Sequence, residues 1–132
     1  MLTGYLVVRL RRDGAAPQCS QMFAVLCDLL ERIVLPEIIR YRIGADRADA
    51  FVEAYRKAGE SLTASPHCSG YELLRSKKDP ELFLLIIRWD SAEGHLRGFR
   101  QSAQFREFFA HIKPYVGDIL EMEHYEATGV TA

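Results

Sequence analysis

The 132-residue sequence predicts an α+β domain built from four strands and two helices in the order β-α-β-β-α-β. Over residues 39–43, apolar positions alternate with two arginines, which is the two-residue period of a strand. Apolar residues recur every three or four positions after residue 48 and again after residue 102, as in helices that face a core. This order is the ferredoxin-like split βαβ arrangement with one four-stranded antiparallel sheet.

The first helix is predicted to begin at Asp46 and Asp49, which have the spacing of a capping pair. Gly59 and the pair Ser65-Pro66 are expected to end it. One face of this helix carries apolar residues at helical spacing: Ala48, Phe51, Val52, Tyr55 and Leu62.

Two further strands are predicted over 71–76 and 81–89, with a turn between them. Every residue of 82–87 is apolar, the composition of a strand that is covered on both faces. Two helices cover only one face of a four-stranded sheet, so the other face needs a layer of similar size. The simplest such layer is the sheet of a second copy, and the sequence therefore predicts a homodimer.

The second helix is predicted to open with the capping pair Asp90 and Glu93, and Gly98 is expected to weaken or bend it. Ser102 is expected to cap its continuation. That continuation has one apolar face: Phe105, Phe108, Phe109 and Ile112. Residues 119–126 then alternate between apolar and charged, which predicts a fourth strand near an edge of the sheet.

The domain is expected over 36–128, between an N-terminal extension (1–35) and a disordered tail (129–132). Within the extension, a short strand fits 5–10 and a peripheral amphipathic helix fits 23–34. This helix packs either on the domain or on the partner subunit. The alternative is that translation begins at Met22.

The composition limits the classes of partner. Lys and Arg together number 17 against 18 Asp and Glu, a balance that argues against nucleic acid or an anionic membrane surface as the main partner. Three cysteines without metal-ligand spacing predict no disulfide framework and a cytoplasmic location. No apolar run approaches the roughly 20 residues of a membrane span, and charged residues from Arg9 onward interrupt any signal peptide.

The most specific motif is Trp89 at the end of the third strand, followed by Ser91 and a helix. The same pattern includes Asp90, between Trp89 and Ser91, and further along the chain His95, Phe99, Ser102, Phe105 and the segment 121–125, EMEHY. Over roughly 36–126 the chain resembles the antibiotic biosynthesis monooxygenase (ABM) domain family. The resemblance implies a dimeric α+β barrel in which each monomer holds a pocket between the sheet and the helices.

That family includes cofactor-free oxygenases of polyketide aromatics, quinol oxygenases and haem-degrading enzymes. The haem-degrading branch uses an Asn on the first strand and a Trp and a His on the second helix. This sequence contains no Asn, and Gly98 and Phe108 stand at the positions of that Trp and His. Haem breakdown of that kind is therefore not expected.

No cofactor or metal motif is present, neither a G-x-G-x-x-G nor an H-E-x-x-H, so no cofactor and no metal are predicted. Chemistry without a cofactor needs an apolar pocket for a flat aromatic, a base, and donors for the resulting oxyanion. With the resemblance, the sequence predicts a cofactor-independent monooxygenase that uses dioxygen on a hydroxylated aromatic or a quinol. The alternative is a non-catalytic dimeric module that binds an aromatic, a lipid-like ligand or haem.

Two residues are predicted to be catalytic. Trp89 can form a flat wall of the pocket or donate its indole N–H to a substrate oxygen, or it can simply pack in the core. His95 lies four residues before Phe99, on the same helical face, and can serve as a base near neutral pH. Alternatively His95 is a surface residue, because Glu93 and Arg97 indicate that part of this helix is exposed.

Five residues are predicted to bind substrate: Tyr41, Tyr71, Phe99, Arg40 and His124. For the two tyrosines the alternative is packing on the sheet. Arg40 can hold an oxyanion or pair with Glu72 or Glu121 on another strand. His124 is in phase with apolar residues of its strand and can also be a buried structural histidine.

Overall fold

The computed structural model describes residues 34–132, and the compact unit that contains the sheet spans Leu35–Glu126. The strand and helix predicted over 5–10 and 23–34, and the start at Met22, lie outside the described residues, apart from Val34. In residues 34–132 no helix is long and apolar enough to cross a membrane.

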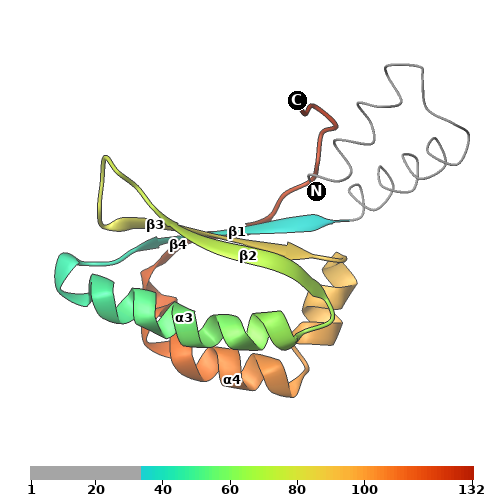
Figure 1. The fold of residues 1–132 in the computed structure, drawn as a ribbon, viewed down its shortest axis with the longest axis horizontal. Coiled ribbons are helices and arrows are strands. Elements are labelled where there is room, and N and C mark those ends of the chain that lie inside the picture. The colour runs from blue at the N-terminus through green and yellow to red at the C-terminus, as the bar shows by residue number, and fades with distance from the viewer. Residues whose placement is uncertain (1–33) are drawn as a thin grey trace, which may run out of the picture. The chain divides into compact units, whose positions relative to one another are not determined.

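The sheet has four strands: β1 (Leu35–Arg42), β2 (Cys68–Arg75), β3 (Leu82–Trp89) and β4 (Ile119–His124). They lie in the order β2-β3-β1-β4, and every neighbouring pair is antiparallel. Both long helices, α3 (Ala48–Ala64) and α4 (Ala103–Ile112), cover the same face of the sheet (Figure 1). The predicted ferredoxin-like α+β fold is confirmed, with β4 at an edge as expected.

The core lies between this face and the helices. Strand β3 alternates strictly, with buried residues toward the helices and half-buried residues on the opposite side. Within the described chain the helices therefore cover only one face of the apolar run. The half-buried series is Leu82, Leu84, Ile86 and Arg88.

Helix α3 starts differently from the prediction. Asp46 lies in a 3-10 turn, Ala45–Arg47, and the residue that precedes α3, Arg47, makes no side-chain capping bond. Gly59 does not end the helix, which continues to Ala64. A Cβ atom on Gly59 would lie 2.0 Å from the hydroxyl oxygen of Tyr71, so this glycine allows β2 to approach the helix closely.

The junction between β3 and α4 also differs. Asp90 does not cap a helix; instead its carboxylate lies 2.9 Å from Nδ1 of His67. The backbone N–H of Gly94 donates to Oγ of Ser91 (2.9 Å), so Ser91 is the capping residue. The residues that follow, Gly94–Phe99, form a π-helix (η2), in which the N–H of residue 100 bonds to the carbonyl of residue 95 at 3.0 Å.

Two features explain how the chain leaves this π-helix. Gly98 leaves room for the ring of His67. A Cβ atom at residue 98 would lie 2.4 Å from Nε2 of His67. Ser102 then caps α4 by accepting from the N–H of Phe105 (3.3 Å), as predicted. A 3-10 turn, Lys113–Asp118, connects α4 to the edge strand.

Candidate functional site

His95 is buried, although its sequence neighbours Glu93 and Arg97 are exposed. The π-helix turns it toward the sheet, where its ring stacks on Trp89 with centroids 4.3 Å apart and planes 7° from parallel. Phe99, four residues after His95, packs against Trp89, with the two ring centroids 5.0 Å apart. Three predicted site residues therefore meet at the end of β3.

Glu37 joins this group from β1. Its Oε1 atom accepts a hydrogen bond from the indole N–H of Trp89 (3.0 Å) and lies 3.7 Å from Nε2 of His95. His124 is paired with Glu37 in the β1–β4 register, and its Nε2 atom lies 2.8 Å from Nδ1 of His95. One donor atom from each of these three residues lies within 4.8 Å of the others. We refer to them as the Glu37–His95–His124 cluster.

The contacts indicate where the ring protons lie. A carboxylate beside Nε2 of His95 favours a proton on that nitrogen, which leaves Nδ1 as an acceptor. His124 then donates from Nε2, and its own Nδ1 keeps a lone pair. His124 is half-buried, whereas Glu37 and His95 are buried, so His124 is the member of the cluster that a ligand can reach.

Burial dominates the electrostatics of the cluster. It lowers the pKa of His95 to about 4, and the charges of His124 and Arg100 act in the same direction. Burial also raises the pKa of Glu37, an effect that the Trp89 hydrogen bond and the charges of His124 and Arg100 oppose. His95 is therefore neutral at pH 7, with a lone pair on one ring nitrogen.

Trp89 has two structural roles. It is 1% exposed and packs in the core, as one of the two predicted alternatives proposed. Its indole N–H is committed to Glu37, so in this conformation it has no donor to offer a substrate. It fixes the carboxylate on one side and the His95 ring on the other.

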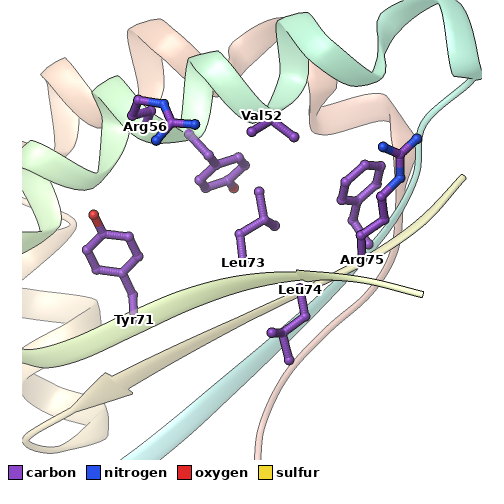
Figure 2. Close-up of a pocket in the computed structure, with 8 residues that line it drawn as sticks. Val52, Arg56, Tyr71, Leu73, Leu74 and Arg75 are labelled. Atoms are coloured by element: carbon purple, nitrogen blue, oxygen red, sulfur yellow. The ribbon is translucent and has the colours of Figure 1, made fainter. Parts of the chain in front are cut away.

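A pocket of about 320 Å³ opens between α3 and β2 (Figure 2). Of the predicted residues only Tyr71 lines it, and Figure 2 shows its hydroxyl directed toward the helix. The guanidinium of Arg75 lies over the ring of Phe83, 5.1 Å from its centroid. The full lining is Val52, Tyr55, Arg56, Tyr71, Leu73, Leu74, Arg75 and Phe83.

Tyr41 lies behind this pocket. Its side chain is fully buried, and its hydroxyl is hydrogen-bonded to that of Tyr55, a residue of the pocket wall. Tyr41 therefore packs in the core, as the alternative for the tyrosines proposed, and can reach the pocket only through Tyr55.

The pocket and the cluster are connected by the sheet register. Tyr71 pairs with Ile87, Ile87 with Glu37, and Glu37 with His124, so all four stand in one cross-strand row on the helix-facing side. Neighbouring strands are about 4.8 Å apart, which places Glu37 about 10 Å from Tyr71. Ile87 alone separates them in this row.

Arg40 is not part of this site. It points to the face of the sheet opposite the helices and is paired with Glu121 (3.7 Å), the alternative that its strand position also allowed. Conversely, Glu37 was missed by the sequence prediction. Its signal was the phase of β1, because Glu37 shares the inward phase of Ile39 and Tyr41.

Comparisons with known proteins agree with this architecture. A structure from Bordetella bronchiseptica, provisionally described as an antibiotic biosynthesis monooxygenase, is similar with a TM-score of 0.64 and 23% identity, over 72% of this chain and 97% of that one. SnoaB from Streptomyces nogalater, described as a cofactor-independent oxygenase, has a TM-score of 0.61 and 16% identity, over 74% and 96% of the two chains. At these identities the likeness shows the fold.

In sequence, the uncharacterized protein YczJ of Bacillus subtilis is 24% identical over 76 residues, which cover 58% of this chain and 80% of that protein. The family model described as antibiotic biosynthesis monooxygenase matches residues 37–111, more than half of the chain. The matched range contains most of β1, the residues that line the pocket, and Glu37 and His95 of the cluster, while His124 lies beyond it. The protein therefore belongs to the antibiotic biosynthesis monooxygenase family.

Proposed function

We propose that this protein is a cofactor-independent monooxygenase that acts on a hydroxylated aromatic compound or a quinol. The observation that carries the proposal is the Glu37–His95–His124 cluster, an acid–base group held beside Trp89 between the sheet and the helices. The proposal also draws on family membership and on the structural likeness to SnoaB, whose description names cofactor-independent oxygenation.

In the proposed mechanism, the substrate hydroxyl gives its proton to Nδ1 of His124. His95 accepts the hydrogen bond from the other side of that ring and, together with Glu37, stabilises the imidazolium that forms. The resulting electron-rich phenolate reduces dioxygen without an external reductant. One oxygen atom enters the ring and the other leaves as water, so that a quinol gives a hydroxyquinone.

The pocket between α3 and β2 supplies the binding surface for the ring. Val52, Leu73 and Phe83 provide apolar contacts, and the guanidinium groups of Arg56 and Arg75 can hold substrate oxygens. The Tyr71 end of the pocket stands in the same cross-strand row as the cluster. His124 lies three strands from Tyr71 in this row, about 14 Å away, with the buried Ile87 and Glu37 between them, so a substrate that reaches both must displace these side chains.

We further propose that the protein is a homodimer that acts in the cytoplasm. The face of the sheet opposite the helices carries the half-buried Ile38, Leu84 and Ile86, an apolar surface that a second sheet would bury. Cys68, the cysteine within the described residues, is a free thiol, which is consistent with a reducing compartment.

The experiment is oxygen uptake with a panel of hydroquinones and anthrones. Wild-type protein should consume oxygen above the buffer rate, and His124→Gln and His95→Gln should each lower kcat by about 10²–10⁴-fold, the usual contribution of a positioned base. His111→Gln is the matched control, because His111 is exposed on α4. Binding of an aromatic without oxygen uptake would instead support the non-catalytic binding module and overturn the oxygenase.

A further inference from the structure

We propose that the Glu37–His95–His124 cluster binds one divalent transition-metal ion, of the chemistry of Zn²⁺ or Fe²⁺. The observation is the meeting of two imidazoles and one carboxylate, from β1, the π-helix and β4, with one donor atom of each within 4.8 Å of the others. No sequence motif brings these donors together, since they are separated by 58 and 29 positions along the chain.

The donor set is one that proteins use for such ions. Two histidines and a glutamate hold Zn²⁺ in open catalytic sites, and two histidines and a carboxylate form the facial triad of Fe²⁺ oxygenases. Both arrangements leave coordination positions free for water or a substrate. The three ligands together carry one negative charge, which offsets half of the charge of the ion.

The donor atoms need one adjustment before they can hold an ion together. Ligand atoms about 2.0–2.1 Å from a tetrahedral ion are about 3.3 Å from one another. His95 Nδ1 and His124 Nε2 are 2.8 Å apart, whereas Glu37 Oε1 lies 3.7 Å from the other ring nitrogen of His95, Nε2. One imidazole gives one nitrogen to an ion, so only one of these two contacts can join a pair of ligand atoms. The most distant pair of donors has to approach by about 1.5 Å, from 4.8 Å. His124 is half-buried on an edge strand, so its ring has room for that adjustment.

The surroundings also resemble a metal site. Metal-bound carboxylates are oriented by outer hydrogen bonds, and Trp89 provides one to Glu37 at 3.0 Å. The same indole stacks on His95 and fixes the plane of its ring. A divalent ion would also compensate the Glu37 carboxylate, which is only 4% exposed.

This inference goes beyond the proposed function and does not depend on it. An ion bound to Nε2 of His124 places that ring's proton on Nδ1, so Nδ1 can no longer accept the substrate proton. The two uses of the cluster therefore exclude each other, and metal-loaded protein should not carry out the cofactor-free oxidation.

The test uses the full chain after treatment with a chelator, titrated with Zn²⁺ by calorimetry and with Co²⁺ by visible absorption. One ion per chain should bind, and His124→Gln and Glu37→Gln should each weaken binding at least tenfold. His67→Gln is the matched control, because His67 lies beside Asp90 outside the cluster and should leave the affinity unchanged. The Co²⁺ spectrum should show nitrogen and oxygen ligation without a thiolate charge-transfer band.

Far-UV circular dichroism establishes that each variant is folded, and the half-buried His124→Gln decides the outcome if Glu37→Gln unfolds. Wild-type affinity in His124→Gln, or a thiolate band with Co²⁺, would overturn the proposal. Zn²⁺ binding at the cluster without oxygen uptake by the metal-free protein removes the proposed function alone. Oxygen uptake that depends on His95, without Zn²⁺ binding, removes the metal site alone.

Discussion

The buried pair of phenols formed by Tyr41 and Tyr55 leads to a quantitative prediction for Tyr41→Phe. Burial raises the pKa of Tyr41 from 10.0 to about 12, although the hydrogen bond with Tyr55 opposes the shift. The unfolded chain therefore loses this proton near pH 10, before the folded chain does. Stability falls as pH rises from 10 to 12, and two pKa units correspond to about 2.7 kcal/mol.

The substitution has a second effect that does not depend on pH in the same way. At pH 8, Tyr41→Phe leaves the hydroxyl of Tyr55 without its partner, which should cost about 1–3 kcal/mol. At pH 12 the wild type has lost the stability that the protonated Tyr41 hydroxyl provides at lower pH, whereas the variant has no hydroxyl at this position. The difference in the free energy of unfolding should therefore shrink by about 2.7 kcal/mol between pH 8 and pH 12, and it can change sign.

Urea denaturation followed by far-UV circular dichroism measures this difference, at one protein concentration throughout because association changes apparent stability. Tyr71→Phe is the matched control, since it removes one phenol hydroxyl from the exposed edge of the pocket, outside the buried pair. A wild-type-to-Tyr41→Phe difference that stays constant from pH 8 to pH 12 would refute the burial of the phenol pair.

Three further predictions concern other parts of the molecule. Ile86→Asp should convert the proposed dimer into a folded monomer, measured by sedimentation velocity, because the interface would bury an unpaired charge. Leu96→Asp, on the exposed helix surface, is the control and should remain a dimer. If Ile86→Asp is still a dimer, the sheet face opposite the helices is not the interface. Ser102→Ala should lower the free energy of unfolding by about 1 kcal/mol through loss of the α4 cap, and an unchanged urea midpoint would contradict the capping role. Gly98→Ala should lower the free energy of unfolding by about 1–3 kcal/mol, because the new Cβ atom would clash with His67. Adding His67→Ala to Gly98→Ala should remove this cost. If the effects of the two substitutions on the free energy of unfolding are additive, the two residues do not touch.

The fold could be predicted because periodic burial leaves a periodic sequence. The alternation in β1, the apolar run of β3 and the face of Phe108 and Ile112 on α4 all follow from which side of each element is buried. The register that completes the sheet then follows from the antiparallel order. Element ends were less predictable, since β2 begins at Cys68 rather than Tyr71.

The candidate site could be predicted only in part. Trp89, His95, Phe99 and His124 were named from the sequence, and the structure brings them together. The fifth member of this group, Glu37, was missed because an acidic residue on a strand is ordinarily exposed. The alternation of β1 turns Glu37 inward, and a hydrogen bond from Trp89, 52 positions away, satisfies the buried carboxylate.

The π-helix was beyond the reach of the sequence patterns. Helical periodicity assumes i to i+4 bonding, whereas this turn bonds i to i+5. The exposure of Glu93 and Arg97 did not predict that of His95, because residues two positions apart point to opposite sides of a helix. The predicted helix caps were also wrong at two positions. Asp46 and Asp90 have the composition of caps, but a 3-10 turn and a contact with His67 use them instead.

The most direct test of the proposed oxygenase is the fate of isotopically labelled dioxygen during turnover of a quinol or anthrone by chelator-treated protein. The proposal predicts one labelled atom in the organic product, with its rate lowered by about 10²–10⁴-fold in His124→Gln and unchanged in His111→Gln. Unlabelled product, or equal rates in wild type and His124→Gln, would contradict it.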